Sequence, residues 1–188
     1  MRLLLVVVVV FVLAGCATRP PPAQPLIRPA QAEHAAFALN GRIAASHEGN
    51  RSSSTLRWAH QPSSDEILLF APLGQTVARI RRDLRGVMLD TADKHYSARD
   101  AEELTHQVLG WHLPLNGLQY WVLALPAPGS EASIERDGNG QISIMRQDGW
   151  EIRYTRYAAQ QPDSLPLRMK LQRNGMELQV LVDEWELQ

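Results

Sequence analysis

The sequence predicts a mainly β protein in which one antiparallel sheet curls towards a barrel without closing. Three observations predict this fold. Apolar and polar residues alternate with period two over most of the chain, tight glycine-containing turns separate the alternating segments, and only two stretches in mid-chain have helical spacing. Many short strands joined by tight turns are typical of an antiparallel sheet, and 188 residues give little reason for a second large domain.

The first fifteen residues are typical of a bacterial lipoprotein signal peptide. Arg2 precedes an apolar run over residues 3–13, well short of the roughly 20 residues that a membrane-spanning helix needs. A Leu-Ala-Gly-Cys motif follows and ends at Cys16, the only cysteine of the chain. We therefore expect residues 1–15 to be removed and Cys16 to carry acyl chains that anchor the protein. The alternative is an ordinary secretory signal with an incidental cysteine.

The residues after Cys16 predict a location and a tether. Ala17 follows the cysteine, whereas an aspartate there favours inner-membrane retention in Gram-negative lipoproteins, so we expect the periplasmic face of the outer membrane. Residues 16–29 combine the lipidated cysteine with a proline-rich stretch, which at about 3.1 Å per residue would reach roughly 40 Å. Residues 30–188 then form a single domain, in which 30–36 could make a short leading helix.

The strands follow from alternation and their borders from turns. Asn174-Gly175, Asp148-Gly149 and the stretch 137–140 are hairpin signals. In the last strand the apolar parity shifts between Val182 and Trp185, which predicts a bulge. The predicted strands are, in chain order, 37–46, 55–59, 66–71, 76–82, 86–90, 94–97, 132–136, 141–146, 150–157, 167–173 and 176–187.

Two helices are predicted in mid-chain. Asp100 can cap a helix over 101–109 that Gly110 ends, and Glu103 lies at the capping-box position. The second helix, over 115–125, is bounded by proline on both sides. Both need an apolar surface, and we expect them to cover the hollow of the half-closed barrel.

Composition and motifs exclude several classes of function. The formal net charge of −1 leaves no basic field for nucleic acid, and with Cys16 lipidated no thiol remains for a redox or thiolate metal site. No histidine pair has the spacing of a zinc protease, no nucleophile elbow is present, and no phosphate-binding loop is present. We therefore expect no catalytic residues, no metal and no cofactor.

One turn carries an unusual residue. Leu73 stands between Pro72 and Gly74, residues that build a tight and exposed turn. A leucine in solvent forgoes about 1.5–3 kcal/mol of burial, which is tolerable if it meets lipid or a lipidated client during function. The alternative is that Leu73 folds back over the core.

The aromatic residues are compatible with two kinds of interior, a packed core and a ligand cavity. Five tryptophans accompany many leucine, isoleucine and methionine residues, as in any packed core. A curled sheet with helices across its hollow could also enclose a cavity for an apolar ligand. The sequence does not decide between a filled and an empty hollow.

The ordered motifs resemble the LolB family, the outer-membrane lipoprotein receptors of the Lol lipoprotein-sorting pathway, over nearly the whole chain after the signal. One departure is Ala124, where the family pattern has glycine. The matching residues are Phe37, Leu39-Asn40-Gly41-Arg42, Trp58, Ala71-Pro72-Leu73-Gly74-Gln75, Ala101-Glu102-Glu103-Leu104, Gly110, Leu113-Pro114-Leu115, Leu118, Tyr120-Trp121, Gly149-Trp150, Tyr154, Tyr157, Leu165-Pro166 and Trp185.

The resemblance implies an incomplete LolA/LolB-like barrel whose helices cover an apolar cavity for lipoprotein acyl chains. It further implies that the protein is a monomer. It also implies the periplasmic carrier LolA as the partner that delivers the cargo, and a membrane-insertion role for Leu73 with Pro72 and Gly74. Alternatives are a lipocalin-like outer-membrane lipoprotein with a small apolar ligand, or an envelope scaffold. The candidates for the acyl-chain cavity are Phe37, Leu39, Trp58, Leu69, Leu118, Trp121, Trp150 and Tyr154.

Overall fold

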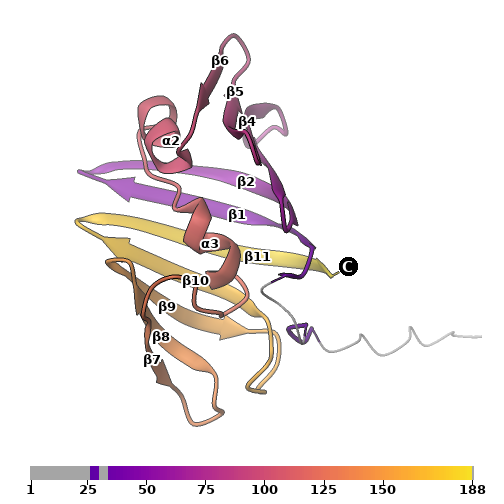
Figure 1. Cartoon of the computed structure of the whole chain (residues 1–188), viewed down its shortest axis with the longest axis vertical. Coiled ribbons are helices and arrows are strands. Elements are labelled where there is room, and N and C mark those ends of the chain that lie inside the picture. The colour runs from indigo at the N-terminus through magenta and orange to yellow at the C-terminus, as the bar shows by residue number, and fades with distance from the viewer. Residues whose placement is uncertain (1–25, 30–33, 188) are drawn as a thin grey trace, which may run out of the picture.

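A computed structural model of the chain describes residues 26–29 and 34–187, and the described strands form one antiparallel sheet (Figure 1). The strand order is β6-β5-β4-β3-β2-β1-β11-β10-β9-β8-β7, so the first and the last of these strands pair in the middle of the sheet. The strands are β1 (Phe37–His47), β2 (Asn50–Gln61), β3 (Ser64–Phe70), β4 (Thr76–Asp83), β5 (Gly86–Asp90), β6 (His95–Ala98), β7 (Ser133–Arg136), β8 (Ile142–Gln147), β9 (Trp150–Tyr157), β10 (Pro166–Arg173) and β11 (Met176–Leu187).

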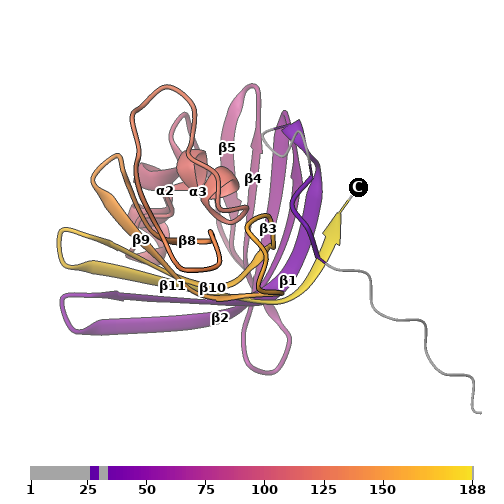
Figure 2. The same cartoon turned by 90° about the horizontal axis from the view of Figure 1, so that it is seen from below.

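The sheet is curved but open. Strands β6 and β7 are its edges, and the described strands do not close into a barrel. Figure 2 shows the sheet as a trough, with helices α2 (Ala101–Leu109) and α3 (Leu115–Trp121) lying on its concave side. The prediction of an incomplete antiparallel barrel with helices over its hollow is confirmed. Below, the hollow means the space between the concave face and these two helices.

Alternation decides which side chains face the hollow. In β1 the burial pattern has period two, with Phe37, Leu39, Ile43 and Ala45 buried on the concave side. The same rule holds in β11, β10 and β9, whose inward residues join one continuous apolar core with the helices. The outward residues between them are mostly polar and exposed or half-buried, as expected for a sheet with one wet face.

The predicted bulge lies where β11 pairs with β1. Asn40 pairs with Glu184, whereas the next residue, Gly41, pairs with Val182, so Asp183 is the extra residue of the bulge. A side chain at Gly41 would place its Cβ 2.1 Å from the carbonyl oxygen of Leu181. Glycine is therefore required here by the close approach of the two backbones.

The hairpin turns follow their predicted chemistry. Asn174 and Gly175 have φ of 50° and 77°, and Asp148 and Gly149 have 51° and 76°, the two positive angles of a type I′ turn. Glu48-Gly49 makes a third such pair between β1 and β2, with φ of 50° and 81°. The sequence prediction missed this third turn because glutamate is an uncommon residue at positive φ.

The helices agree with the prediction except at one end. Asp100 caps α2 by accepting a hydrogen bond from the Glu103 backbone amide, and Gly110 ends the helix in the left-handed conformation. The prediction that the second helix continues to residue 125 was wrong, because α3 ends at Trp121. Ala124 has φ of 54° and Pro126 disfavours a helical residue before it, so the chain turns away. Ala124 thus occupies a left-handed position that favours glycine, the residue that the resemblance leads us to expect there.

The described part of the segment before β1 already contacts the domain. Residues 1–25 lie outside the described part, so the signal peptide, Cys16 and most of the tether remain expectations. Ile27 forms an antiparallel bridge with Ser164, and the Arg28 amide donates to the carbonyl of Asp163 at 2.8 Å. Of the predicted leading helix, residues 30–33 are not described. No helix in the described part is long and apolar enough to cross a membrane.

The close approach at the bulge gives a stability prediction. Gly41→Ala is expected to destabilise the fold by about 1–3 kcal/mol, because the β1–β11 pair must separate to admit a methyl group. Gly138→Ala is the matched control, since nothing lies within 4 Å of a Cβ built there. Chemical denaturation followed by circular dichroism measures both variants, and equal midpoints would contradict the role given to Gly41.

Candidate functional site

The predicted acyl-chain residues all lie in the apolar interior. Phe37, Leu39, Trp58 and Leu69 come from the sheet, and Leu118 and Trp121 come from α3. Trp150 and Tyr154 come from β9, and the most exposed of all eight, Tyr154, shows only 6% of its surface. Strands on both sides of the β1–β11 pair therefore contribute to one hollow that α3 covers.

Aromatic side chains fill much of this hollow. The Phe37 ring lies edge-on to Trp58 and Trp185, with centroids 5.2 and 5.5 Å apart. The rings of Trp121 and Trp150 are 6.4 Å apart. The interior is apolar as predicted, and in this conformation the protein's own side chains occupy it. An acyl chain would therefore have to displace them.

Polar groups of the sheet hold α3 in place over the hollow. The Trp121 indole donates to Gln147 Oε1 at 2.9 Å, and the Tyr154 hydroxyl donates to the Trp121 carbonyl at 2.8 Å. Burial raises the pKa of Tyr154 well above its ordinary value, so the phenol keeps its proton and remains a donor. Each bond satisfies a buried polar group that would otherwise cost free energy.

A second anchor begins at a buried aspartate. Asp65, at the start of β3, accepts hydrogen bonds from the Trp58 indole at 2.8 Å and from Arg82, and its Oδ1 lies 2.7 Å from His60 Nδ1. Arg82 also donates to Gln119 of α3 at 3.0 Å. The network therefore ties three strands to the helix and balances the buried carboxylate with a guanidinium.

The N-terminal segment supplies a third anchor. Arg28 donates through one nitrogen, Nη1, to the carbonyl oxygens of Leu123 and Ala124, at 3.2 and 2.7 Å. These carbonyls follow the C-terminal end of α3, where a cation is favourable. Arg28, which lies inside the predicted tether, is thus bonded to the turn that follows α3.

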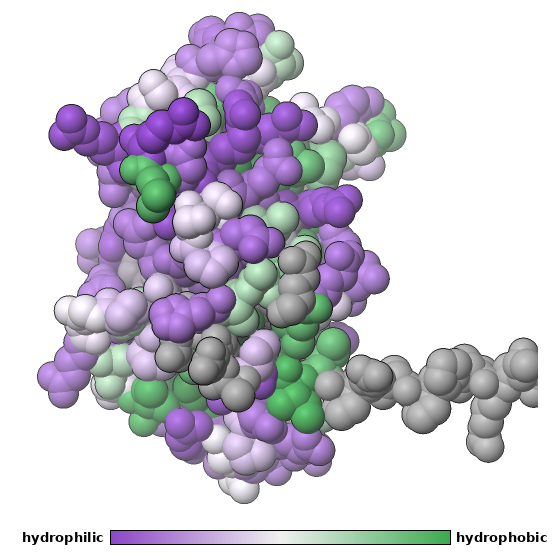
Figure 3. Space-filling model, turned by 45° about the vertical axis from the view of Figure 1, so that its right-hand side comes forward, coloured by the Kyte–Doolittle hydropathy of each residue, from purple (hydrophilic) through white to green (hydrophobic). Residues whose placement is uncertain are grey.

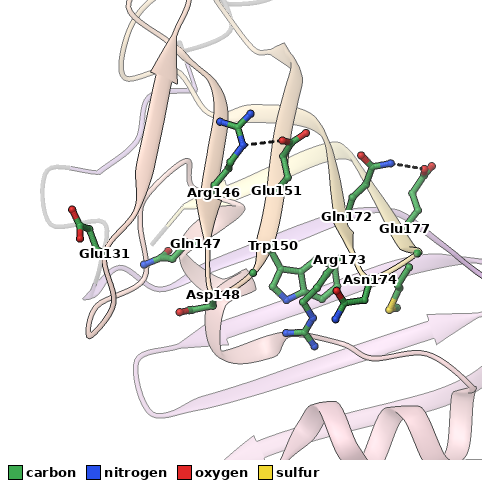
Figure 4. A pocket seen from close by; sticks show the side chains of 13 residues that line it. Glu131, Arg146, Gln147, Asp148, Trp150, Glu151, Gln172, Arg173, Asn174 and Glu177 are labelled. Carbon is green, nitrogen blue, oxygen red and sulfur yellow. Dashed lines mark hydrogen bonds and ion pairs between the residues drawn. The ribbon is translucent and has the colours of Figure 1, made fainter.

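Helix α2 is held at the opposite end of the hollow. Arg173 of β10 donates to Glu102 at 2.8 Å, and its guanidinium lies 4.6 Å from the centre of the Trp150 ring. Figure 4 shows Arg173 and Trp150 at a pocket of about 580 Å³ between the β8–β9 and β10–β11 turns. Charged side chains such as Arg146 and Glu151 surround this pocket, so its chemistry does not suit an acyl chain.

The predicted loop projects into solvent. Leu73 is 86% exposed, so the alternative in which it folds back over the core is not observed. The Gly74 amide donates to the Ala71 carbonyl and the Ala71 amide donates to the Gln75 carbonyl, both at 2.8 Å. These bonds and the φ of 86° at Gly74 make a tight turn that leaves the leucine at its tip. Figure 2 shows the β3–β4 loop extending from the convex side, opposite the helices.

A second turn also exposes a leucine. Leu84, between β4 and β5, is 90% exposed and lies at the other end of β4 from Leu73. Figure 3 shows one face of the molecule, whose upper part is mostly hydrophilic and carries only isolated apolar residues. Exposure alone therefore does not mark a membrane contact. The sequence signal at residue 84 was the same as at residue 73, an apolar residue in a tight turn, and was overlooked.

The structure also brings together residues that the sequence did not. The Asp65–Arg82–Gln119 link and the Arg28 contacts join positions far apart in the chain, and no local pattern indicates them. Within residues 26–29 and 34–187, no group of three or more His, Cys, Asp or Glu side chains could hold a metal ion.

The open sheet with helices over an apolar hollow is a fold that this chain shares with a protein of solved structure. A LolA superfamily protein from Nitrosomonas europaea has a solved structure that matches 82% of this chain and 87% of its own, with a TM-score of 0.51 at 9% identity. Similarity at that identity supports the fold alone.

Sequence comparison gives the family. The family described as "Outer membrane lipoprotein LolB" matches residues 35–185, and the chain belongs to it. The outer-membrane lipoprotein LolB of Chromobacterium violaceum is 39% identical over 98% of this chain and 99% of its own. That of Nitrosomonas europaea is 41% identical over 87% of this chain and 78% of its own. The predicted family is confirmed.

The Arg28 contacts predict a change in the stability of the helical cover. Arg28→Ala should lower the free energy of unfolding by about 1–3 kcal/mol, because two partly buried carbonyls lose a charged donor. Hydrogen exchange should accelerate over residues 115–125. Arg28→Lys, which retains the charge, should restore part of the protection, and unchanged exchange in the alanine variant would rule out the anchor.

Proposed function

We propose that this chain is the outer-membrane receptor that accepts lipoproteins from the periplasmic carrier LolA, binds their acyl chains in the hollow and inserts them into the outer membrane. Membership of the family of outer-membrane lipoproteins named LolB supports this function. The protein itself would be held at the periplasmic face by acyl chains on Cys16. The structural observation that carries the proposal is a leucine tip, 86% exposed, on a sheet whose other face is apolar and covered.

The acceptance step needs the helical cover to move. The hollow is lined by apolar side chains from strands and from α3, and an acyl chain entering it would replace contacts between them. Each buried methylene contributes about 0.8 kcal/mol, so a chain of ordinary length can offset the loss of a few anchoring hydrogen bonds. The bonds from Gln147, Tyr154, Arg82 and Arg28 are therefore the contacts expected to break.

The insertion step requires contact with lipid. Leu73 lies at the tip of a turn that is internally hydrogen-bonded, so the turn itself holds this side chain in solvent. Transfer of this side chain into the membrane would recover about 1.5–3 kcal/mol of burial. Cargo then moves from carrier to receptor to bilayer because each site holds the acyl chains more favourably than the last, and no covalent bond is made or broken.

The test is an incorporation assay with the Leu73→Glu variant. LolA loaded with a labelled lipoprotein is mixed with outer-membrane vesicles and with this protein, wild type or variant. The variant should strip cargo from the carrier as the wild type does, because the hollow is untouched, but should transfer at least about tenfold less to the vesicles, given the cost of burying a charge.

Leu84→Glu is the matched control. Leu84 is equally exposed but lies in the turn at the opposite end of β4, so its substitution should leave transfer unchanged. If both variants fail equally, the loss comes from surface charge and not from the β3–β4 loop. If the wild type takes no cargo from the carrier, the receptor function falls, and binding of a small apolar ligand or scaffolding takes its place.

A further inference from the structure

We propose that a pocket on the convex face of the sheet binds the phosphate of a phospholipid headgroup, and so fixes how the β3–β4 loop meets the membrane. The pocket encloses about 350 Å³ and is lined by residues of β1, β2, β3, β10 and β11 together with Pro72 of the loop. The proposal deepens the function proposed above and rests on its premise that Leu73 enters lipid.

Strand register builds this pocket from one row of outward-facing residues. Phe70 of β3 pairs with Thr55 of β2, which pairs with Arg42 of β1. Arg42 pairs in turn with Leu181 of β11, and Leu181 pairs with Arg168 of β10. The row alternates with the inward row that faces the hollow, so the pocket and the hollow lie on opposite faces of the same strands.

Two arginines give the pocket its chemistry. Arg42 and Arg168 flank β11, and their backbones lie roughly 10 Å apart because neighbouring strands are separated by about 4.8 Å. Their long side chains can therefore reach one group placed between them. Within residues 26–29 and 34–187, no hydrogen bond or ion pair engages the guanidinium of Arg168. Guanidinium groups match phosphate oxygens in charge and geometry.

The remaining polar contacts also suit a phosphate ester. Arg42 donates to Asp183 at 3.0 Å, but both side chains are more than half exposed, and the guanidinium retains further donors. Ser53 and Thr55 add hydroxyl donors to the lining. Phe70, Pro72 and Leu181 supply apolar walls, which a free phosphate would not use but the glycerol and first methylenes of a phospholipid would.

The position of the pocket identifies the membrane as the source of the ligand. Pro72 lines the pocket and directly precedes Leu73, and the loop extends from this same convex side (Figure 2). When Leu73 reaches the apolar layer, the adjoining pocket lies at the depth of the headgroups. The phosphate contact would then limit how far the loop inserts and orient the sheet against the membrane.

Photocrosslinking tests the proposal in the full lipidated protein. The protein is reconstituted in nanodiscs of phosphatidylethanolamine and phosphatidylglycerol with labelled phospholipid, and p-benzoylphenylalanine replaces the exposed Thr76, which pairs with Phe70 beside the pocket, or, as a positional control, the exposed Ser97 of β6. The Thr76 position should crosslink to phospholipid and the Ser97 position should not. Arg42→Gln with Arg168→Gln should reduce the Thr76 crosslink about tenfold, the effect of losing two charged donors.

A matched variant separates the site from general charge. Arg99→Gln removes one exposed arginine that, in the described part of the chain, also has no hydrogen bond or ion pair, and it should leave the crosslink unchanged. Thermal unfolding checks that the double variant is folded. An unchanged crosslink in the double variant, or an equal loss in Arg99→Gln, overturns the proposal. So does competition by millimolar glycerol phosphate, which would show a site for the free ester.

The two proposals fail in different ways. If Leu73→Glu transfers cargo normally, the insertion role of the loop fails in the incorporation assay, whatever the crosslink shows. If the crosslink is independent of Arg42 and Arg168 while Leu73→Glu still blocks transfer, the headgroup site fails and the receptor function stands.

Discussion

The apolar concave face of the sheet is the constraint on which the rest of the structure depends. A closed barrel would remove this face from water with strands alone, but here the edge strands β6 and β7 remain apart. The face must then be covered by something else, and the chain uses α2, α3 and the turn that follows. Burial of an apolar face is favourable in proportion to the area removed from water and does not depend on direction. An apolar chain of similar shape can therefore take the place of the cover.

The cover is attached in a way that permits such exchange. The bonds that hold α3 and its turn come from a few side chains of β4, β8, β9 and the N-terminal segment. A hydrogen bond of this kind contributes about 1 kcal/mol net, so the cover is fixed by a few modest terms and can be released together. The Asp65 network differs, since its buried carboxylate must keep a charged partner, and we expect Arg82 to stay with Asp65 when Gln119 leaves.

Local features of the sequence predicted most of the fold and part of the site. Alternation placed Phe37, Leu39 and Trp58 on the buried face, and Asn-Gly and Asp-Gly pairs placed the hairpins, because both depend only on neighbours in the chain. The end of α3 was predicted too late because the apolar spacing continues beyond Trp121, whereas the backbone at Ala124 turns left-handed. The contacts of Arg28, Asp65 and Arg173 could not be predicted, since they depend on how distant strands meet.

The distance between the hollow and the β3–β4 loop bears on how cargo could leave. Leu69 is buried on the concave side of β3, and Leu73 at the loop tip is exposed, only four residues later. An extended chain of that length spans at most about 14 Å. If Leu73 lies in lipid, the Leu69 end of the hollow therefore lies within about that distance of the membrane, less than the length of an acyl chain of ordinary size. One end of a bound chain could then reach lipid before the other end has left the hollow, so little apolar surface would be exposed to water at any moment. The loop follows β3, and β3 also lines the hollow. This arrangement would allow transfer without an aqueous intermediate.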